Sequence, residues 1–111
     1  MTSSSPVDGS AGELLRERDR VVDRLRSMAL DDVPNDAVRR AAQRLEDLAA
    51  AGRGEPPRPV PQLAPHAAGD QVTVLVGELT TAPPDISKTA TAVLVELRSA
   101  LAPGPLTSQE V

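Results

Sequence analysis

The sequence predicts an all-α protein, a small single domain of four helices, and three observations support this class. Apolar residues recur every three or four positions over residues 10–30 and 36–51, which is the period of an amphipathic helix. The same period returns within residues 66–102. Between these halves, five prolines fall within residues 56–65, so that stretch cannot continue a helix. We therefore expect a charged αα-hairpin, a proline-rich crossover and two apolar helices.

The first predicted helix spans residues 10–30 and follows a polar segment, residues 1–9, that we expect to be a disordered tail. Ser10-Ala-Gly-Glu13 matches a capping box, in which the serine hydroxyl bonds the amide of Glu13 and Glu13 reaches back. The apolar stripe consists of Leu14, Leu15, Val21, Val22, Leu25, Met28 and Ala29. On the other face, the pairs Glu13–Arg16, Glu17–Arg20 and Asp23–Arg26 should each support the helix by about 0.2–0.5 kcal/mol.

The second predicted helix begins after a turn over residues 31–35, where Asn35 or Asp36 can serve as the N-cap. Gly52 stands where a left-handed C-cap residue belongs. The apolar stripe of this helix consists of Val38, Ala41, Ala42, Leu45, Leu48 and Ala49. Because the turn is short, the first two helices are expected to be antiparallel neighbours.

Residues 53–65 form the predicted connector, which should be extended because proline fixes φ and removes backbone donors. Val60 and Leu63 could pin it across the bundle. Pro56-Pro-Arg-Pro59 also contains a PxxP pattern that could dock on an aromatic-lined groove of a partner. The pattern is frequent in proline-rich linkers, so we interpret the segment as a spacer inside the domain.

Residues 66–102 admit two interpretations. The first is two helices, because two apolar stripes have helical spacing. The first stripe consists of Val72, Leu75, Val76 and Leu79. The second consists of Ile86, Ala90, Val93, Leu94, Leu97 and Leu101, and Asp85 is the expected N-cap of its helix. The alternative is an α+β fold in which 72–79 pairs with 89–97 as a β-hairpin, because the first segment is rich in β-branched residues. Strict alternation fails in both segments, which favours helices. The domain is then residues 10–102, followed by a disordered tail over 103–111.

Both predicted C-terminal helices have apolar residues on a second face. Val74 lies opposite the first stripe, and Val95, flanked by Ala92 and Ala102, lies opposite the second. An amphipathic surface helix would be polar at these positions. Either the first two helices cover this second face or a second copy of the chain does. Val74, Ala92, Val95 and Ala102 are therefore the candidate interface, and homodimerisation is a hypothesis.

The composition removes most catalytic and metal-binding chemistry. The 111 residues include no aromatic residue and no cysteine, and His66 is the one histidine. His66 and Asp70 supply too few ligands for a zinc site, and the acidic turn at residues 31–36 lacks the spacing of a calcium loop. No serine or threonine is accompanied by a recognisable base, and no phosphate-binding glycine loop occurs. We expect no enzyme activity, no cofactor and no metal.

The charge and hydropathy patterns narrow the class of partner. A net charge of −4 disfavours a general nucleic-acid or anionic-membrane binder. No apolar run approaches the roughly 20 residues of a membrane helix, and no signal peptide is visible, so we expect a cytoplasmic protein. The leading prediction is an accessory or regulatory protein that acts through helix-face contacts with a protein partner or with itself.

Two other functions stay open. One is a small nucleic-acid-associated regulator that uses an arginine-rich helical face, formed by Arg16, Arg20, Arg24, Arg39, Arg40 and Arg44. The acids interleaved with these arginines in the first helix are more typical of a solvated ion-pair surface. The other is a non-catalytic subunit of an enzyme complex.

Overall fold

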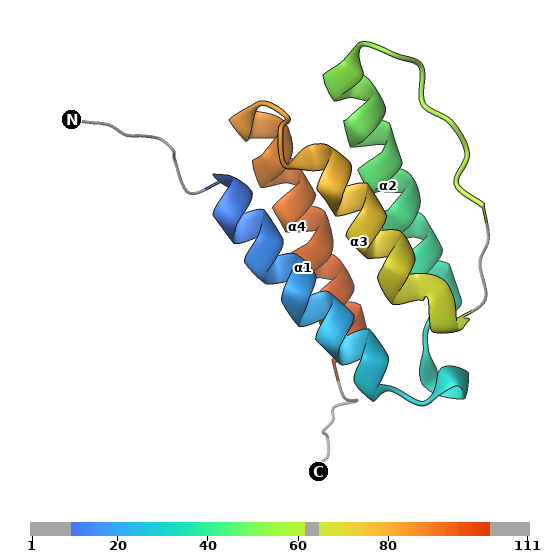
Figure 1. Ribbon diagram of the computed structural model, residues 1–111. Coiled ribbons are helices and arrows are strands. Elements are labelled where there is room, and N and C mark those ends of the chain that lie inside the picture. The colour runs from blue at the N-terminus through green and yellow to red at the C-terminus, as the bar shows by residue number, and fades with distance from the viewer. Residues whose placement is uncertain (1–9, 62–64, 103–111) are drawn as a thin grey trace.

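The computed structural model describes residues 10–61 and 65–102, and these residues form a four-helix bundle (Figure 1). The helices are α1 (Ser10–Ser27), α2 (Asn35–Arg53), α3 (Ala68–Leu79) and α4 (Pro84–Leu101), with short 3₁₀ turns η2 (Leu30–Asp32) and η3 (Pro65–Ala67). The predicted all-α class is confirmed. The predicted tails and Leu63 lie outside the described residues.

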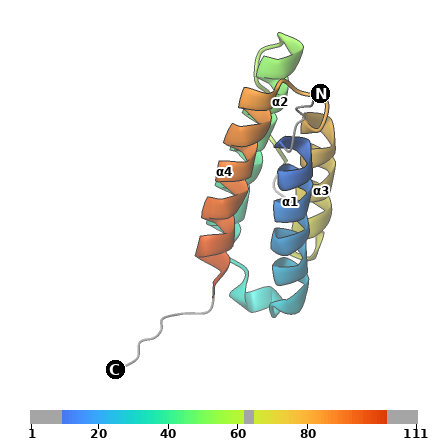
Figure 2. The ribbon, with the colours of Figure 1, turned by 90° about the vertical axis from the view of Figure 1, so that its left-hand side faces the viewer.

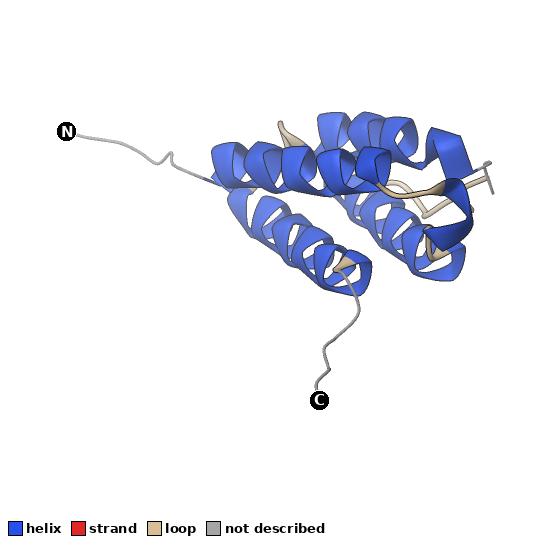
Figure 3. Cartoon of the chain, turned by 90° about the horizontal axis from the view of Figure 1, so that it is seen from below, coloured by secondary structure: helices blue, strands red, loops and turns tan. Residues whose placement is uncertain are grey.

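The alternative β-hairpin is wrong, because the described part of the chain contains no strand (Figure 3). Residues 72–79 lie in α3 and residues 89–97 in α4. Helix formation turns Val72, Leu75, Val76 and Leu79 onto one buried side, whereas a strand would place Leu75 on the opposite face from Val72 and Val76. Burial of the complete stripe therefore outweighs the β propensity of the valines.

The helices do not pack in the order of the chain. α1 packs mainly against α4 and α3, and α2 packs against the same two helices. Figure 2 shows α1 and α4 side by side. α1 and α2 therefore occupy opposite corners of the bundle, as α3 and α4 do.

This order corrects the predicted hairpin of closely packed neighbours. The connection over residues 28–34, which includes η2, lets α2 cross to the far corner. Each of the two charged helices then covers its apolar stripe with the more apolar α3 and α4. Direct packing of α1 on α2 would leave part of those apolar surfaces in water, which is unfavourable.

The core consists of aliphatic side chains from all four helices. Leu14, Leu45, Leu79, Leu94 and Leu101 are the largest fully buried side chains. Alanines fill the spaces between them, and these small residues allow the helix backbones to approach closely. The buried alanines are Ala41, Ala42, Ala49, Ala50, Ala68 and Ala90. Since no aromatic ring contributes, the apolar area that stabilises the fold comes from many small contributions.

The described part of α1 starts at Ser10, and the starts of α2 and α4 differ from the prediction. Pro34 occupies the N-cap of α2 and Pro83 that of α4, so neither Asn35 nor Asp85 caps through its side chain. A proline at a helix start fixes φ near the helical value. Here that restraint replaces the side-chain cap that the sequence suggested.

The C-terminal end of α2 is also displaced from the prediction. Gly54, not Gly52, adopts the left-handed conformation, with φ of 71°. The Glu55 N–H then donates to the Ala50 carbonyl at 2.9 Å, which closes the helix end. Gly52 stays helical and lies close to α4: a Cβ added there would meet Ile86 Cδ1 at 3.7 Å. No helix in the described ranges is long and apolar enough to cross a membrane.

Candidate functional site

The segment over residues 54–61 forms a strap that runs beside α2 (Figure 1) and reaches α3 at Pro61. Gln43 on α2 holds the strap with both ends of its amide: Nε2 donates to the Arg58 carbonyl, and Oε1 accepts from the Val60 N–H, each at 2.9 Å. Gln71 on α3 donates to the Pro61 carbonyl at 3.1 Å. Val60 packs against the core, as predicted. The strap is therefore a fixed wall, although its sequence resembles a linker.

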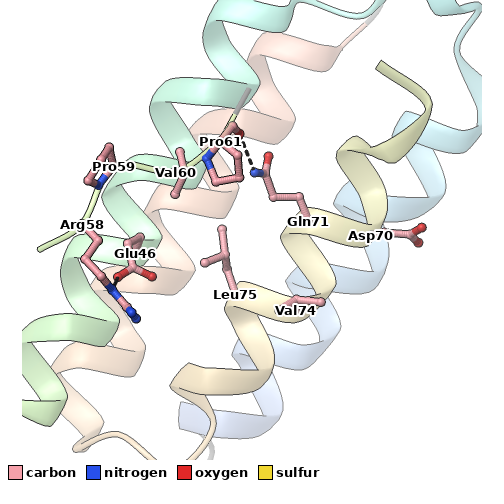
Figure 4. Close-up of a pocket in the computed structure, with 9 residues that line it drawn as sticks. All are labelled: Glu46, Arg58, Pro59, Val60, Pro61, Asp70, Gln71, Val74 and Leu75. Carbon is pink, nitrogen blue, oxygen red and sulfur yellow. Dashed lines mark hydrogen bonds and ion pairs between the residues drawn. The ribbon is translucent and has the colours of Figure 1, made fainter. Parts of the chain in front are cut away.

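A groove of about 460 Å³ lies between the strap, α2 and α3 (Figure 4). Its volume falls in the range of roughly 300–1,000 Å³ that is typical of ligand sites. The residues that line it are Glu46, Arg58, Pro59, Val60, Pro61, Asp70, Gln71, Val74 and Leu75. Most of this lining is apolar, and the Val74 side chain at its border is 62% exposed. The arrangement offers a preformed surface for apolar side chains.

Charged groups of opposite sign stand at different parts of the groove. The Glu46 carboxylate is buried, and its Oε2 lies 3.5 Å from Arg53 Nη2 and 3.6 Å from Arg58 Nε. Arg58 itself is 68% exposed, and besides its contact with Glu46 its charge helps to lower the pKa of Glu55. Asp70 is 82% exposed, 4.0 Å from Arg26, and points away from the strap in Figure 4. The Arg58 guanidinium and the Asp70 carboxylate are therefore both exposed to solvent near the apolar walls of the groove.

Arg53 joins the end of α2 to the strap and to α3. Its guanidinium contacts Glu55 at 2.8 Å, Glu78 at 3.0 Å and Glu46 at 3.5 Å. The hydrogen bond with Glu55, more than the other carboxylates, raises the pKa of Arg53. The same hydrogen bond lowers the pKa of Glu55 below its ordinary value of 4.5. When the Glu55 carboxylate is ionised, these contacts hold the first residues of the strap against the end of α2.

The Glu55 contact should be sensitive to acid. Because the folded-state pKa of Glu55 is depressed, its contribution to stability is present above pH 4.5 and is lost as the pH falls through the folded-state pKa. We expect a ¹³C NMR titration of the Glu55 carboxyl to show a midpoint below 4.5. Arg53→Gln should move the midpoint up toward 4.5. Equal midpoints in the two proteins would contradict this assignment.

The four predicted interface residues do not form one surface. Val74 lies on α3 beside the groove, whereas Ala92 and Val95 lie on α4 and Ala102 follows its last residue. α3 and α4 occupy opposite corners of the bundle. α1 and α2 flank both helices but leave the second apolar face open, since Val74 is 62% and Val95 41% exposed. Residues 10–61 and 65–102 thus present two separate exposed apolar sites, one on α3 and one on α4.

The arginines proposed as one helical face are also divided, between α1 and α2. Several of them border α4 instead. Arg24 Nε donates to the Leu101 carbonyl at 2.7 Å, and Arg44 pairs with Glu96. Of the predicted pairs within α1, the contact between Glu17 and Arg20 forms at 3.1 Å. Arg26 turns instead toward Asp70 on α3.

Glu17 is a buried charge, although its predicted pairing with Arg20 implied a surface position. It is 3% exposed and binds Arg98 of α4 as well as Arg20. A signal for this burial exists in the sequence, because Glu17 lies three residues after Leu14 and four before Val21, inside the apolar stripe. The ion pair therefore links α1 to α4 at the border of the core.

His66 is exposed in η3. No group of three or more histidine, cysteine or acidic side chains in the described ranges is arranged to hold a metal ion. No protein-family model, curated protein or solved structure matches the chain. The two exposed apolar surfaces, at Val74 and at Val95, are therefore the candidate binding sites of the described residues.

Proposed function

We propose that the protein is a non-enzymatic, accessory or regulatory binding module whose groove accepts an apolar segment of a partner protein. The observation that supports this most is the position of Val74, an exposed valine beside an apolar groove whose walls are fixed. Isolated exposed valines are common on protein surfaces. One that borders a preformed concave surface of this size is a candidate contact residue.

The strap determines how a partner segment can bind. Pro59 and Pro61 have no N–H group, and the Val60 N–H is already bonded to Gln43. Residues 59–61 therefore have no free backbone donor for an added β-strand, which disfavours that mode of binding. The remaining mode is insertion of side chains, and an amphipathic helix presents such anchors at intervals of three and four residues.

The charges beside the groove define the rest of the partner. Arg58 faces solvent next to Pro59 and Val60, and Asp70 faces solvent on the α3 side. Complementary charges on a partner improve orientation and association rate more than affinity. The expected segment has apolar anchors that enter between the strap and Val74, with an acidic residue near Arg58 and a basic residue near Asp70.

Selection from a displayed library of random helical peptides tests this proposal even while the natural partner is unidentified. We expect enriched peptides to share apolar anchors and to bind with Kd of about 10 µM, roughly 7 kcal/mol. Val74→Asp should weaken them at least about tenfold, since it places a charge against apolar anchors. Thr73→Asp adds the same charge to the same helix outside the groove and should leave the affinity unchanged.

A second variant and an NMR measurement separate groove binding from general stickiness. Gln43→Ala removes both hydrogen bonds that position residues 58–60, so it should also weaken the selected peptides. In ¹⁵N spectra, the bound peptide should shift the amide signals of Val60, Gln71 and Val74. Two results would refute the proposal. One is that the selected peptides bind Val74→Asp and the natural protein with equal affinity. The other is that the selection yields no peptide with a Kd below about 1 mM.

A further inference from the structure

We propose that the outer face of α4 is a second binding surface, one that accepts an acidic amphipathic helix of a protein partner. This face lies across the bundle from α3 and its groove, because α3 and α4 occupy opposite corners. The inference is independent of the groove and rests on the side chains that line α4 and its two neighbours.

The centre of the α4 face is small and apolar. Lys88, Ala92, Val95 and Ser99 follow one another at three- and four-residue spacing, so they share one side of the helix. All four are exposed, and Val95 is 41% exposed. Alanine and serine present little bulk, so a second helix can approach the α4 backbone closely at this stripe. The stripe is long enough for several turns of a partner helix.

Basic side chains border this stripe on both sides. On the α1 side, Arg98 and Arg20 meet at Glu17, and Arg24 reaches the end of α4. On the α2 side, Arg44 contacts Glu96, and Arg40 lies in the same shallow hollow between α2 and α4. Arg20 and Arg98 share the single carboxylate of Glu17, and Arg44 pairs with Glu96, so five arginines stand beside two contacting carboxylates. Asp85 lies one turn before Lys88 on the same helix. The border is therefore basic, although the whole chain has a net charge of −4.

The combination of an apolar centre and basic borders favours an acidic helix over other occupants. Such a helix places apolar residues on Ala92 and Val95 and carboxylates toward the two rows of arginines, and the charge pattern is complementary. A second copy packed symmetrically through this face would bring like charges together. Nucleic acid is recognised through polar donors across its contact surface, whereas alanine and valine occupy the middle here.

The experiment uses two dye-labelled peptides, each about five helical turns long, that share one stripe of leucine and alanine. One has glutamates beside the stripe, and the other has lysines at the same positions. We expect the acidic peptide to bind with Kd of about 10 µM by fluorescence anisotropy, at least about tenfold tighter than the basic peptide. Its affinity should fall as salt is raised, because salt screens the arginine–carboxylate contacts.

Three substitutions assign the binding to the α4 face. Val95→Asp and Arg40→Glu should each weaken the acidic peptide about tenfold, whereas Thr81→Asp, in the turn before α4, should not. Helical circular dichroism at 222 nm confirms that each variant is folded. In the natural protein, the peptide should shift the amide signals of Ala92, Val95 and Ser99.

Several results would overturn this inference. Equal binding of the two peptides would remove the electrostatic basis, and undiminished binding to Val95→Asp would place the peptide elsewhere. Arg40-dependent binding that is tighter for a short DNA duplex, or for vesicles with anionic lipid, would identify a different class of partner. A dimer in light scattering that Val95→Asp dissociates would show that a second copy covers the face. If Val74→Asp abolished binding of the acidic peptide while Val95→Asp and Arg40→Glu did not, the peptide would bind in the groove and not on α4.

Discussion

Leu94→Ala is expected to lower the free energy of unfolding by about 2–5 kcal/mol, a large part of the roughly 5–15 kcal/mol that stabilises a typical domain. Leu94 is fully buried on α4, which packs between α1 and α2. The substitution removes apolar contacts and leaves a cavity among aliphatic side chains. The core contains no aromatic ring whose contacts could compensate for the loss.

Urea unfolding followed by circular dichroism at 222 nm measures this effect, since the chain has no tryptophan for fluorescence. Val95→Ala is the matched control, because it removes apolar atoms from the next residue at a site that is 41% exposed. We expect the control to cost less than about 0.5 kcal/mol. If the free energy of unfolding of Leu94→Ala differed from that of the natural protein by less than about 0.5 kcal/mol, the core would tolerate the cavity.

Arg98→Ala is expected to destabilise the protein by about 3 kcal/mol, because it leaves the buried Glu17 carboxylate without its partner on α4. Glu17→Leu should cost much less, about 1 kcal/mol or below. The reason is an asymmetry in burial: Glu17 is 3% exposed, whereas the Arg98 and Arg20 side chains are 44% and 60% exposed and can return to water.

The double variant Glu17→Leu/Arg98→Ala completes the test. Once the buried carboxylate is gone, removal of Arg98 should add little, so the double variant should resemble Glu17→Leu alone. Urea unfolding of the four proteins gives the coupling free energy directly. If Glu17→Leu proved as destabilising as Arg98→Ala, the ion pair would be a net source of stability, not a buried charge that needs neutralisation.

The fold class could be predicted because helical periodicity is a local property of the sequence. The stripes of Leu14–Val21–Leu25 and Val72–Leu75–Leu79 define their helices without reference to the rest of the chain. The order in which the helices pack is not local, since it depends on how much apolar area each pair can bury. The short connection after α1 suggested neighbours, but α1 and α2 bury their stripes against α3 and α4 instead.

The candidate site was only partly visible in the sequence. Val74 and Val95 could be found because apolar residues on a second helix face break the amphipathic pattern. Their separation onto two surfaces follows from the packing order and could not be found in the same way. The roles of Gln43 and Gln71 also depend on contacts between distant segments. A glutamine beside an apolar stripe has no pattern that indicates which backbone group it will bind.

The diagonal placement of α1 and α2 has a consequence for how the chain acquires its structure. In the folded protein, α1 and α2 do not bury their apolar stripes against each other, and α1 has its most extensive contacts with α4. One of these contacts joins Arg24 to Leu101, 77 positions further along the sequence. Contacts between such distant segments slow folding, because a large loop must close before they form. During synthesis, α4 is the last of the four helices to be made. Until then α1 and α2 can pack only against α3, so the parts of their apolar surfaces that α4 covers stay exposed in the nascent chain.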